Sequence, residues 1–278
     1  MESTMARGNV RERAVNPHDI VTREYGKIIK DNPGNVEAFY NRGCTHKYKG
    51  ALESAIRDFN RIIELDPSHS HSYNRKADIY FENGQFKRAI ENYLKVIELS
   101  NNNQVLALAC NKTGEALTAI GEYDKALEYL DRVFALTGPK TLRARLGYYN
   151  RGVTYYKKGN YDRSIEDFER VLEIQPKYPY AFYFRGLAYA RKSEYRKAVL
   201  DFNHAVANSN GIPLMARALY NRGVAYEKLG NFVQASQDYD GALKLNPKDP
   251  SSILARASLA THLRLMASPP TPQHSDDS

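Results

Sequence analysis

The tetrapeptide Tyr-Asn-Arg-Gly occurs three times in the chain, at residues 40–43, 149–152 and 220–223. Two near copies, Tyr-Asn-Arg-Lys at 73–76 and Tyr-Phe-Arg-Gly at 183–186, extend the series. A motif that recurs along one chain indicates a structural repeat, and a repeat constrains the fold more than composition does. Aligning the chain on these copies predicts six repeat units, which begin near residues 36, 70, 107, 145, 179 and 216.

Each repeat unit is predicted to contain two helices. In the fourth unit, Tyr148, Gly152 and Tyr155 share one face of a first helix because they stand at i, i+4 and i+7. Gly159 is expected to end that helix, and Pro176 follows the second. The apolar face of the second helix consists of Ile165, Phe168, Val171 and Leu172. Helices of about 12 to 15 residues are not stable alone in water, so neighbouring hairpins must stack, as in a solenoid.

Small residues recur at the eighth and twentieth positions of the units. Position 8 holds Gly43, Ala77, Gly114, Gly152, Gly186 and Gly223. Position 20 holds Ala55, Ala89, Ala126, Ser164, Ala198 and Ala235. Glycine inside a helix costs about 1 kcal/mol relative to alanine. We therefore expect position 8 to lie where two helices approach closely, with position 20 supplying the matching contact.

This pattern, with a proline closing several units, resembles the tetratricopeptide repeat, a helix–turn–helix of about 34 residues. The similarity runs from about Val36 to Asp249. It implies an all-α fold, a right-handed α-solenoid of six tetratricopeptide repeats. The predicted repeats are residues 36–69, 70–106, 107–144, 145–178, 179–215 and 216–250. Extra residues before the third, fourth and sixth units predict either longer loops or an additional helical turn.

The two ends of the chain depart from the repeat. Residues 19–35 resemble a second helix without its first, because Tyr25, Ile28 and Pro33 match positions 24, 27 and 32. Residues 1–18 are expected to be a decayed first helix or disordered. The C-terminal region is predicted to form a capping helix and then a disordered tail, at residues 251–266 and 267–278.

Charge and cysteine content limit the classes of partner and compartment. The chain has 40 Lys and Arg against 32 Asp and Glu, a net charge of +8, which favours acidic partners and keeps nucleic acid open. Two cysteines, Cys44 and Cys110, do not make a disulfide framework. The N-terminus lacks the apolar core of a secretory signal, and no apolar run approaches the length of a membrane span. The sequence predicts a cytoplasmic protein without membrane insertion, with the nucleus and the cilium as alternatives.

No catalytic or metal-binding motif emerges from the sequence. Phosphate-loop, serine-elbow and zinc signatures are absent. His69 and His71, with Asp66 nearby, lack a third strong ligand pattern and are assigned to a solvated turn. The carboxylates of the second helices, as in residues 164–173, are assigned to a solvated face with i, i+4 pairs. We therefore predict no enzymatic activity, no cofactor and no metal.

The resemblance implies that first helices line a concave groove, with positions 2, 5, 9 and 12 facing inward. In units four to six these positions are apolar and rich in tyrosine, whereas in units one to three they are more polar. The predicted partner-binding residues are Tyr149, Asn150, Tyr156, Tyr180, Tyr183, Phe184, Arg217, Tyr220, Asn221 and Lys228. The alternative for the tyrosines at position 5 is packing between helices. Tyrosines at position 11 are expected in the core, namely Tyr155, Tyr189 and Tyr226.

The sequence thus predicts a non-catalytic scaffold or adaptor that binds a peptide or helical segment of another protein. The alternatives are a structural subunit of an organelle, ciliary or cytoskeletal assembly, a basic nucleic-acid-binding solenoid, and a regulatory subunit or a fragment of a larger enzyme. Some tetratricopeptide proteins grip the C-terminal carboxylate of heat-shock chaperones. Only Asn41 and Arg75 match that clamp, and a third anchor position holds His71, so we do not expect a chaperone clamp.

Overall fold

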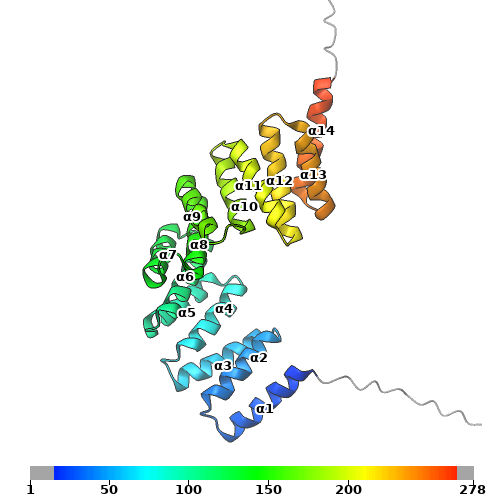
Figure 1. Cartoon of the computed structure of the whole chain (residues 1–278). Helices are drawn as coiled ribbons and strands as arrows, with labels where there is room; N and C mark the ends of the chain where they lie inside the picture. The colour runs from blue at the N-terminus through cyan, green and yellow to red at the C-terminus, as the bar shows by residue number, and fades with distance from the viewer. Residues whose placement is uncertain (1–15, 268–278) are drawn as a thin grey trace, which may run out of the picture. The chain divides into compact units, whose positions relative to one another are not determined.

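The computed structural model describes residues 16–267, and these form 14 α-helices and no strand (Figure 1). The all-α fold class is confirmed. The helices are α1 (Pro17–Asp31), α2 (Val36–Tyr48), α3 (Leu52–Leu65), α4 (Ser70–Glu82), α5 (Phe86–Leu99), α6 (Asn103–Ala119), α7 (Tyr123–Thr137), α8 (Leu142–Lys158), α9 (Tyr161–Ile174), α10 (Pro179–Arg191), α11 (Tyr195–Asn208), α12 (Ile212–Lys228), α13 (Phe232–Leu245) and α14 (Pro250–Ala267). Of the predictions for residues 1–18 and 267–278, those at 1–15 and 268–278 lie outside the described residues, whereas Pro17 and His18 begin α1 and Ala267 ends α14, so the predicted boundaries are corrected there.

Consecutive helices pack as hairpins. The pairs α2 with α3, α4 with α5, α8 with α9, α10 with α11 and α12 with α13 lie side by side (Figure 1). The chain divides into two compact parts, which we call the N-terminal part, up to Ala109, and the C-terminal part, from Cys110. Each part is a stack of such hairpins, the arrangement of a tetratricopeptide solenoid.

The extra residues before the third, fourth and sixth units lengthen helices and not loops. The first helices α6, α8 and α12 have 17 residues, whereas α2, α4 and α10 have 13. The added turn of α8 is capped by Thr141, whose hydroxyl accepts a hydrogen bond from the Ala144 amide at 3.1 Å. A side-chain oxygen at this position satisfies one of the amides that a helix N-terminus leaves unpaired.

The first helices end in a left-handed residue. Gly159 has φ 87° and closes α8, as the sequence predicted. In the fifth unit Ser193 takes a positive φ of 61°, the only residue other than glycine to do so within residues 16–267. Glycine adopts this conformation without the clash that a Cβ atom introduces.

The close approach expected at position 8 is confirmed, but its partner differs from the prediction. A Cβ atom on Gly152 would lie 3.1 Å from two ring carbons of Phe168 and 3.2 Å from the Cβ of Asp167. The nearest contacts therefore come from positions 23 and 24, and not from the small residue at position 20. The same glycine-to-ring contact recurs in three other units, as Gly43 with Phe59, Gly186 with Phe202 and Gly223 with Tyr239.

The arginine of the tetrapeptide joins the two helices of its hairpin. Arg151 donates to both carboxylate oxygens of Asp167, at 2.9 and 2.6 Å, and also to Asp131 of the preceding helix at 2.6 Å. The same bidentate pair occurs as Arg42 with Asp58, Arg185 with Asp201 and Arg222 with Asp238. Paired N–H donors match the two oxygens of a carboxylate in both geometry and charge.

These pairs correct one expectation about the second helices. Asp167 is only 3% exposed, so it does not belong to the solvated face to which the sequence assigned it. Position 23 faces the first helix, and the arginine sixteen residues earlier compensates its charge. Burial raises the pKa of the Asp167 carboxyl, and the hydrogen bonds and charge of Arg151 oppose that rise. In the second unit Lys76 and Asn92 replace the arginine and the aspartate.

Candidate binding groove

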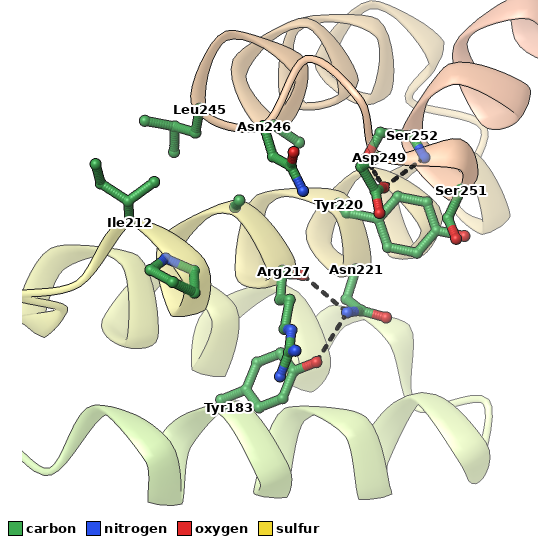
Figure 2. Close-up of a pocket in the computed structure, with 13 residues that line it drawn as sticks. Tyr183, Ile212, Arg217, Tyr220, Asn221, Leu245, Asn246, Asp249, Ser251 and Ser252 are labelled. Atoms are coloured by element: carbon green, nitrogen blue, oxygen red, sulfur yellow. Dashed lines mark hydrogen bonds between the residues drawn. The ribbon is translucent and has the colours of Figure 1, made fainter. Parts of the chain in front are cut away.

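A pocket of about 490 Å³ lies in the C-terminal part, between α10, α12, α13 and the start of α14 (Figure 2). Its volume falls in the range of small-molecule and peptide side-chain pockets. The residues that line it are Tyr183, Ile212, Pro213, Ala216, Arg217, Tyr220, Asn221, Ala242, Leu245, Asn246, Asp249, Ser251 and Ser252. Four of them, Tyr183, Arg217, Tyr220 and Asn221, are among the residues that the sequence predicted for the groove.

Arg217 is the cation of this pocket. Its side chain is exposed, and among residues 16–267 no carboxylate lies within 4.0 Å of its guanidinium. Arg222, one turn later on α12, is by contrast bound to Asp238 at 2.5 Å. The two arginines on the same helix therefore differ in their contacts: Arg222 joins the two helices of its hairpin, whereas Arg217 makes no such pair among the described residues.

The amide of Asn221 links two first helices across the pocket wall. Its Nδ2 donates to the Tyr183 hydroxyl at 3.3 Å and to the Arg217 carbonyl oxygen at 2.8 Å (Figure 2). The side-chain carbonyl oxygen points away from both partners in Figure 2. The Asn221 amide nitrogen thus links Tyr183 to α12.

A carboxylate stands at the opposite rim of the pocket. Asp249 caps α14, because its Oδ2 accepts hydrogen bonds from the Ser252 amide at 2.8 Å and the Ser252 hydroxyl at 2.6 Å. These hydrogen bonds lower the pKa of Asp249, so the carboxyl is ionised at neutral pH. The pocket therefore presents a positive group on α12 and a negative group at the start of α14.

The tyrosines at position 5, which the sequence predicted for the groove, pack against the second helix of their own hairpin. The ring of each position-5 tyrosine lies within the range of an aromatic pair from the ring at position 24 of the same unit. This contact favours the alternative of packing between helices. The centroid distance is 6.0 Å in all three units, for Tyr149 with Phe168, Tyr183 with Phe202 and Tyr220 with Tyr239. Burial raises the pKa of Tyr149 and of Tyr183, so both hydroxyls stay neutral.

The difference in burial between the tyrosines at positions 5 and 11 is therefore smaller than the sequence indicated. Tyr155 is 8% exposed and belongs to the core as predicted. Tyr189 and Tyr226 are only half-buried, although both pack against the apolar cluster around Phe202. Side-chain burial at both positions depends on the neighbouring unit, which a single repeat does not show.

The remaining predicted groove residues form a second group on α8 and α10. Phe184 stacks on Phe168, with a centroid distance of 5.8 Å, and lies 5.8 Å from Tyr149. The hydroxyl of Tyr156 accepts a hydrogen bond from Arg191 at 3.2 Å. Asn150 donates to the side chain of Asn111 at 3.2 Å. Tyr180 is 45% exposed, and Lys228 is exposed in the last turn of α12, outside the pocket lining.

Sequence reasoning missed the part of the pocket that comes from turns. Asn246, Asp249, Ser251 and Ser252 flank the turn between α13 and α14, whereas the predicted groove was restricted to first helices. Ile212 and Pro213 come from the additional turn of α12. The sequence feature that could have indicated this part of the pocket is the Asn-Pro-Lys-Asp-Pro segment at 246–250, whose polar side chains can cap the adjoining helices.

The residues considered for other sites have structural roles in the N-terminal part. Arg75, one of the two residues that match the chaperone clamp, donates to the Tyr40 hydroxyl at 3.0 Å. His69 caps α4, with its Nδ1 2.9 Å from the Ser72 hydroxyl, and Asp66 accepts from Ser68. Within residues 16–267 no three His, Cys, Asp or Glu side chains gather as metal ligands would. No helix of this described region is both long and apolar enough to cross a membrane.

Comparison with known proteins identifies the repeat. A family profile described as tetratricopeptide repeat matches residues 36–69, 146–178 and 216–249, and a second profile of the same description matches residues 70–103. The TPR repeat-containing protein MJ1428 of Methanocaldococcus jannaschii is 24% identical over 156 residues, which are 52% of this chain and 26% of that protein. The chain thus spans about a quarter of the length of this curated relative.

Solved structures share the fold at low sequence identity. The Cut9–Hcn1 hetero-tetramer of the APC/C superposes with a TM-score of 0.66 and 17% identity, over 87% of this chain and 46% of that chain. YrrB, described as a TPR protein with an unusual peptide-binding site, superposes with a TM-score of 0.55 and 22% identity, over 71% of this chain and 98% of its own. The stacked hairpins, the profile matches at four units and the curated relative agree, and the chain belongs to the tetratricopeptide repeat family.

Proposed function

We propose that this chain is a non-catalytic protein-interaction scaffold that holds a segment of a partner protein along α8, α10 and α12. The tetratricopeptide fold is that of protein–protein interaction scaffolds, and the family is generally non-catalytic. The ten groove residues predicted from the sequence are the proposed contact surface, and the pocket beside α12 is its anchor point.

The observation that carries this proposal is the unpaired guanidinium of Arg217 beside Tyr183 and Tyr220. Aromatic rings and arginine are the side chains most often found at the centres of protein interfaces. Asp249 lines the same pocket and feels the charge of Arg217, but no carboxylate of the described residues lies within 4.0 Å of the guanidinium, so a ligand carboxylate can still form a direct pair with it. The proposed partner segment therefore places an Asp, a Glu or a terminal carboxylate in the pocket.

The recurring position of the arginines within the hairpins bears on the choice between a protein partner and nucleic acid, because these arginines are already paired. Four arginines of the first helices are bound to buried aspartates, so they contribute little to the field that a phosphate backbone would meet. Each of these pairs is neutral, so the net charge of +8 is carried by the remaining residues, and the preference for a protein partner rests on the pocket and the fold. YrrB shares this fold and has an unusual peptide-binding site, which supports a peptide ligand for this chain.

Selection from a displayed library of random peptides tests the proposal. Peptides enriched on the wild-type chain are expected to be acidic and to lose at least tenfold in affinity for Arg217→Glu. The matched control is Arg196→Glu, because Arg196 is equally exposed but lies on the second helix α11. Equal binding by wild type and Arg217→Glu would refute the anchor.

The same assay separates the nucleic-acid alternative. A single-stranded RNA oligonucleotide is added as a competitor over a salt titration. Displacement of the peptides by RNA, with affinity falling steeply as salt rises, would support the rival function. The proposal expects no displacement at physiological salt.

A further inference from the structure

The last helix, α14, has the register of a first helix. In α12, positions 3 and 10 are Ala218 and Ala225, which are 0% and 1% exposed. Counting from Pro250, the same positions of α14 hold Ser252 and Leu259, each 1% exposed. These buried residues pack α14 onto α13, as the first helix of a seventh unit would pack. Within residues 16–267 no second helix follows it.

The other face of α14 is apolar and open. Leu254 at position 5 is 72% exposed, whereas Tyr220, its counterpart in α12, is half-buried. Ile253 is 49% exposed, and Ala257, at the position of the hairpin glycines, is exposed. A helix that caps a repeat array has a polar outer face. The predicted capping helix therefore covers α13 but leaves uncovered the surface that would receive a second helix.

The first described helix, α1, shows the complementary half of a hairpin. Its Val21 and Ile28, at positions 20 and 27, are 39% and 41% exposed. The residues at these positions of α3, Ala55 and Ile62, are 0% exposed because α2 covers them. On its opposite side α1 packs against α2, partly through Ile29. Thus α1 is a second helix whose first helix is absent from the described residues.

The two open faces match in charge. In complete units an arginine at position 7 pairs with an acidic residue at position 23. On α14 position 7 is Arg256, and on α1 position 23 is Glu24. Arg256 already donates to Asp240 on the preceding helix at 2.7 Å, as Arg151 does to Asp131. Arg256 therefore lacks only the second carboxylate that Arg151 has within its own unit.

The two faces also match in size. Position 8 of α14 is Ala257, and position 24 of α1 is Tyr25. The second unit has the same combination, Ala77 and Tyr93, and both side chains are fully buried in one apolar cluster. An alanine against a tyrosine ring is thus a contact that this chain already packs well.

We propose that copies of this chain associate head to tail, with α14 of one copy packed on α1 of the next to complete a hairpin. In that junction Arg256 pairs with Glu24, and Ala257 lies against Tyr25. The association buries the exposed apolar side chains of both helices, which is the driving force expected for such a contact. It is independent of peptide binding, because none of these residues lines the pocket.

Sedimentation velocity of the full chain over a range of concentrations tests the junction. The average mass of the wild type is expected to rise above 31.6 kDa as concentration increases. Leu254→Asp and Val21→Asp are each expected to abolish that rise by placing a charge in the apolar contact. Leu200→Asp is the control, because Leu200 is 60% exposed on α11 and belongs to neither face. Circular dichroism of each variant verifies that the helices are retained.

Mixing the two blocked variants identifies the geometry. Leu254→Asp retains the α1 face and Val21→Asp retains the α14 face, so an equimolar mixture is expected to form a one-to-one dimer although neither associates alone. A wild type that stays monomeric at every concentration overturns the proposal. Self-association of Val21→Asp alone also overturns it, because the contact would then join two copies of α14.

Discussion

The Gly223→Ala substitution tests the contact that sets the spacing of the hairpins. A Cβ atom at Gly223 would lie 2.8 and 2.9 Å from ring carbons of Tyr239. The ring would have to move by about 0.7 Å, given that non-bonded carbons rest about 3.5 to 4.0 Å apart. Tyr239 is 1% exposed, and its hydroxyl donates to Glu227 at 2.8 Å, so it has little room to move.

Two opposing effects determine the size of this change. Overpacking a core costs about 1–3 kcal/mol, and replacing a helical glycine by alanine gains about 1 kcal/mol. The difference between these two terms is about 0 to 2 kcal/mol, and we expect a net loss of about 1 kcal/mol in the free energy of unfolding. The loss should spread to adjoining units because repeat arrays are stabilised by nearest-neighbour contacts.

Gly241→Ala is a matched control in the same hairpin. Gly241 lies inside α13, and its added Cβ would meet only Leu219 at 3.4 Å, an ordinary contact. This variant should gain up to about 1 kcal/mol from helix propensity alone. Urea denaturation followed by circular dichroism measures both midpoints. If Gly223→Ala unfolds at the wild-type urea concentration or above it, the ring of Tyr239 is not held as the structure indicates.

Two further predictions concern the ion pairs and the last helix. Arg151→Met alone should lower the free energy of unfolding by about 3–5 kcal/mol, because Asp167 is left buried without a partner. Arg151→Met combined with Asp167→Leu should come close to the wild-type free energy of unfolding. Thermal denaturation measures both variants, and equal losses in the single and double variants would contradict the buried-charge explanation. Deleting residues 251–278 should expose the α13 surface that Leu259 covers and increase light scattering, whereas deleting residues 268–278 should leave both scattering and melting temperature unchanged.

The sequence alone determined the repeat and therefore the fold. The spacing of the tetrapeptide and of the small residues predicted two helices per unit, because a glycine tolerated inside a helix marks a close helix crossing. Helix ends followed from local signals such as Gly159, whose left-handed conformation is a property of the residue itself. These features depend on residues close together in the sequence of one unit, so they can be predicted from the sequence pattern.

Only the tertiary structure decided what each side chain contacts across helices and between units. Position 8 meets the ring at position 24, and Asp167 turns inward, because the crossing of the two helices selects the facing side chains. The pocket likewise combines α10 of the fifth unit, α12 and the turn before α14 of the sixth unit, and the start of α14. Such contacts depend on how neighbouring units pack, and that packing decides whether a side chain is buried in the core, forms an ion pair within a hairpin or lines the pocket. Arg222 and Arg217, five residues apart on one helix, differ in role for this reason alone.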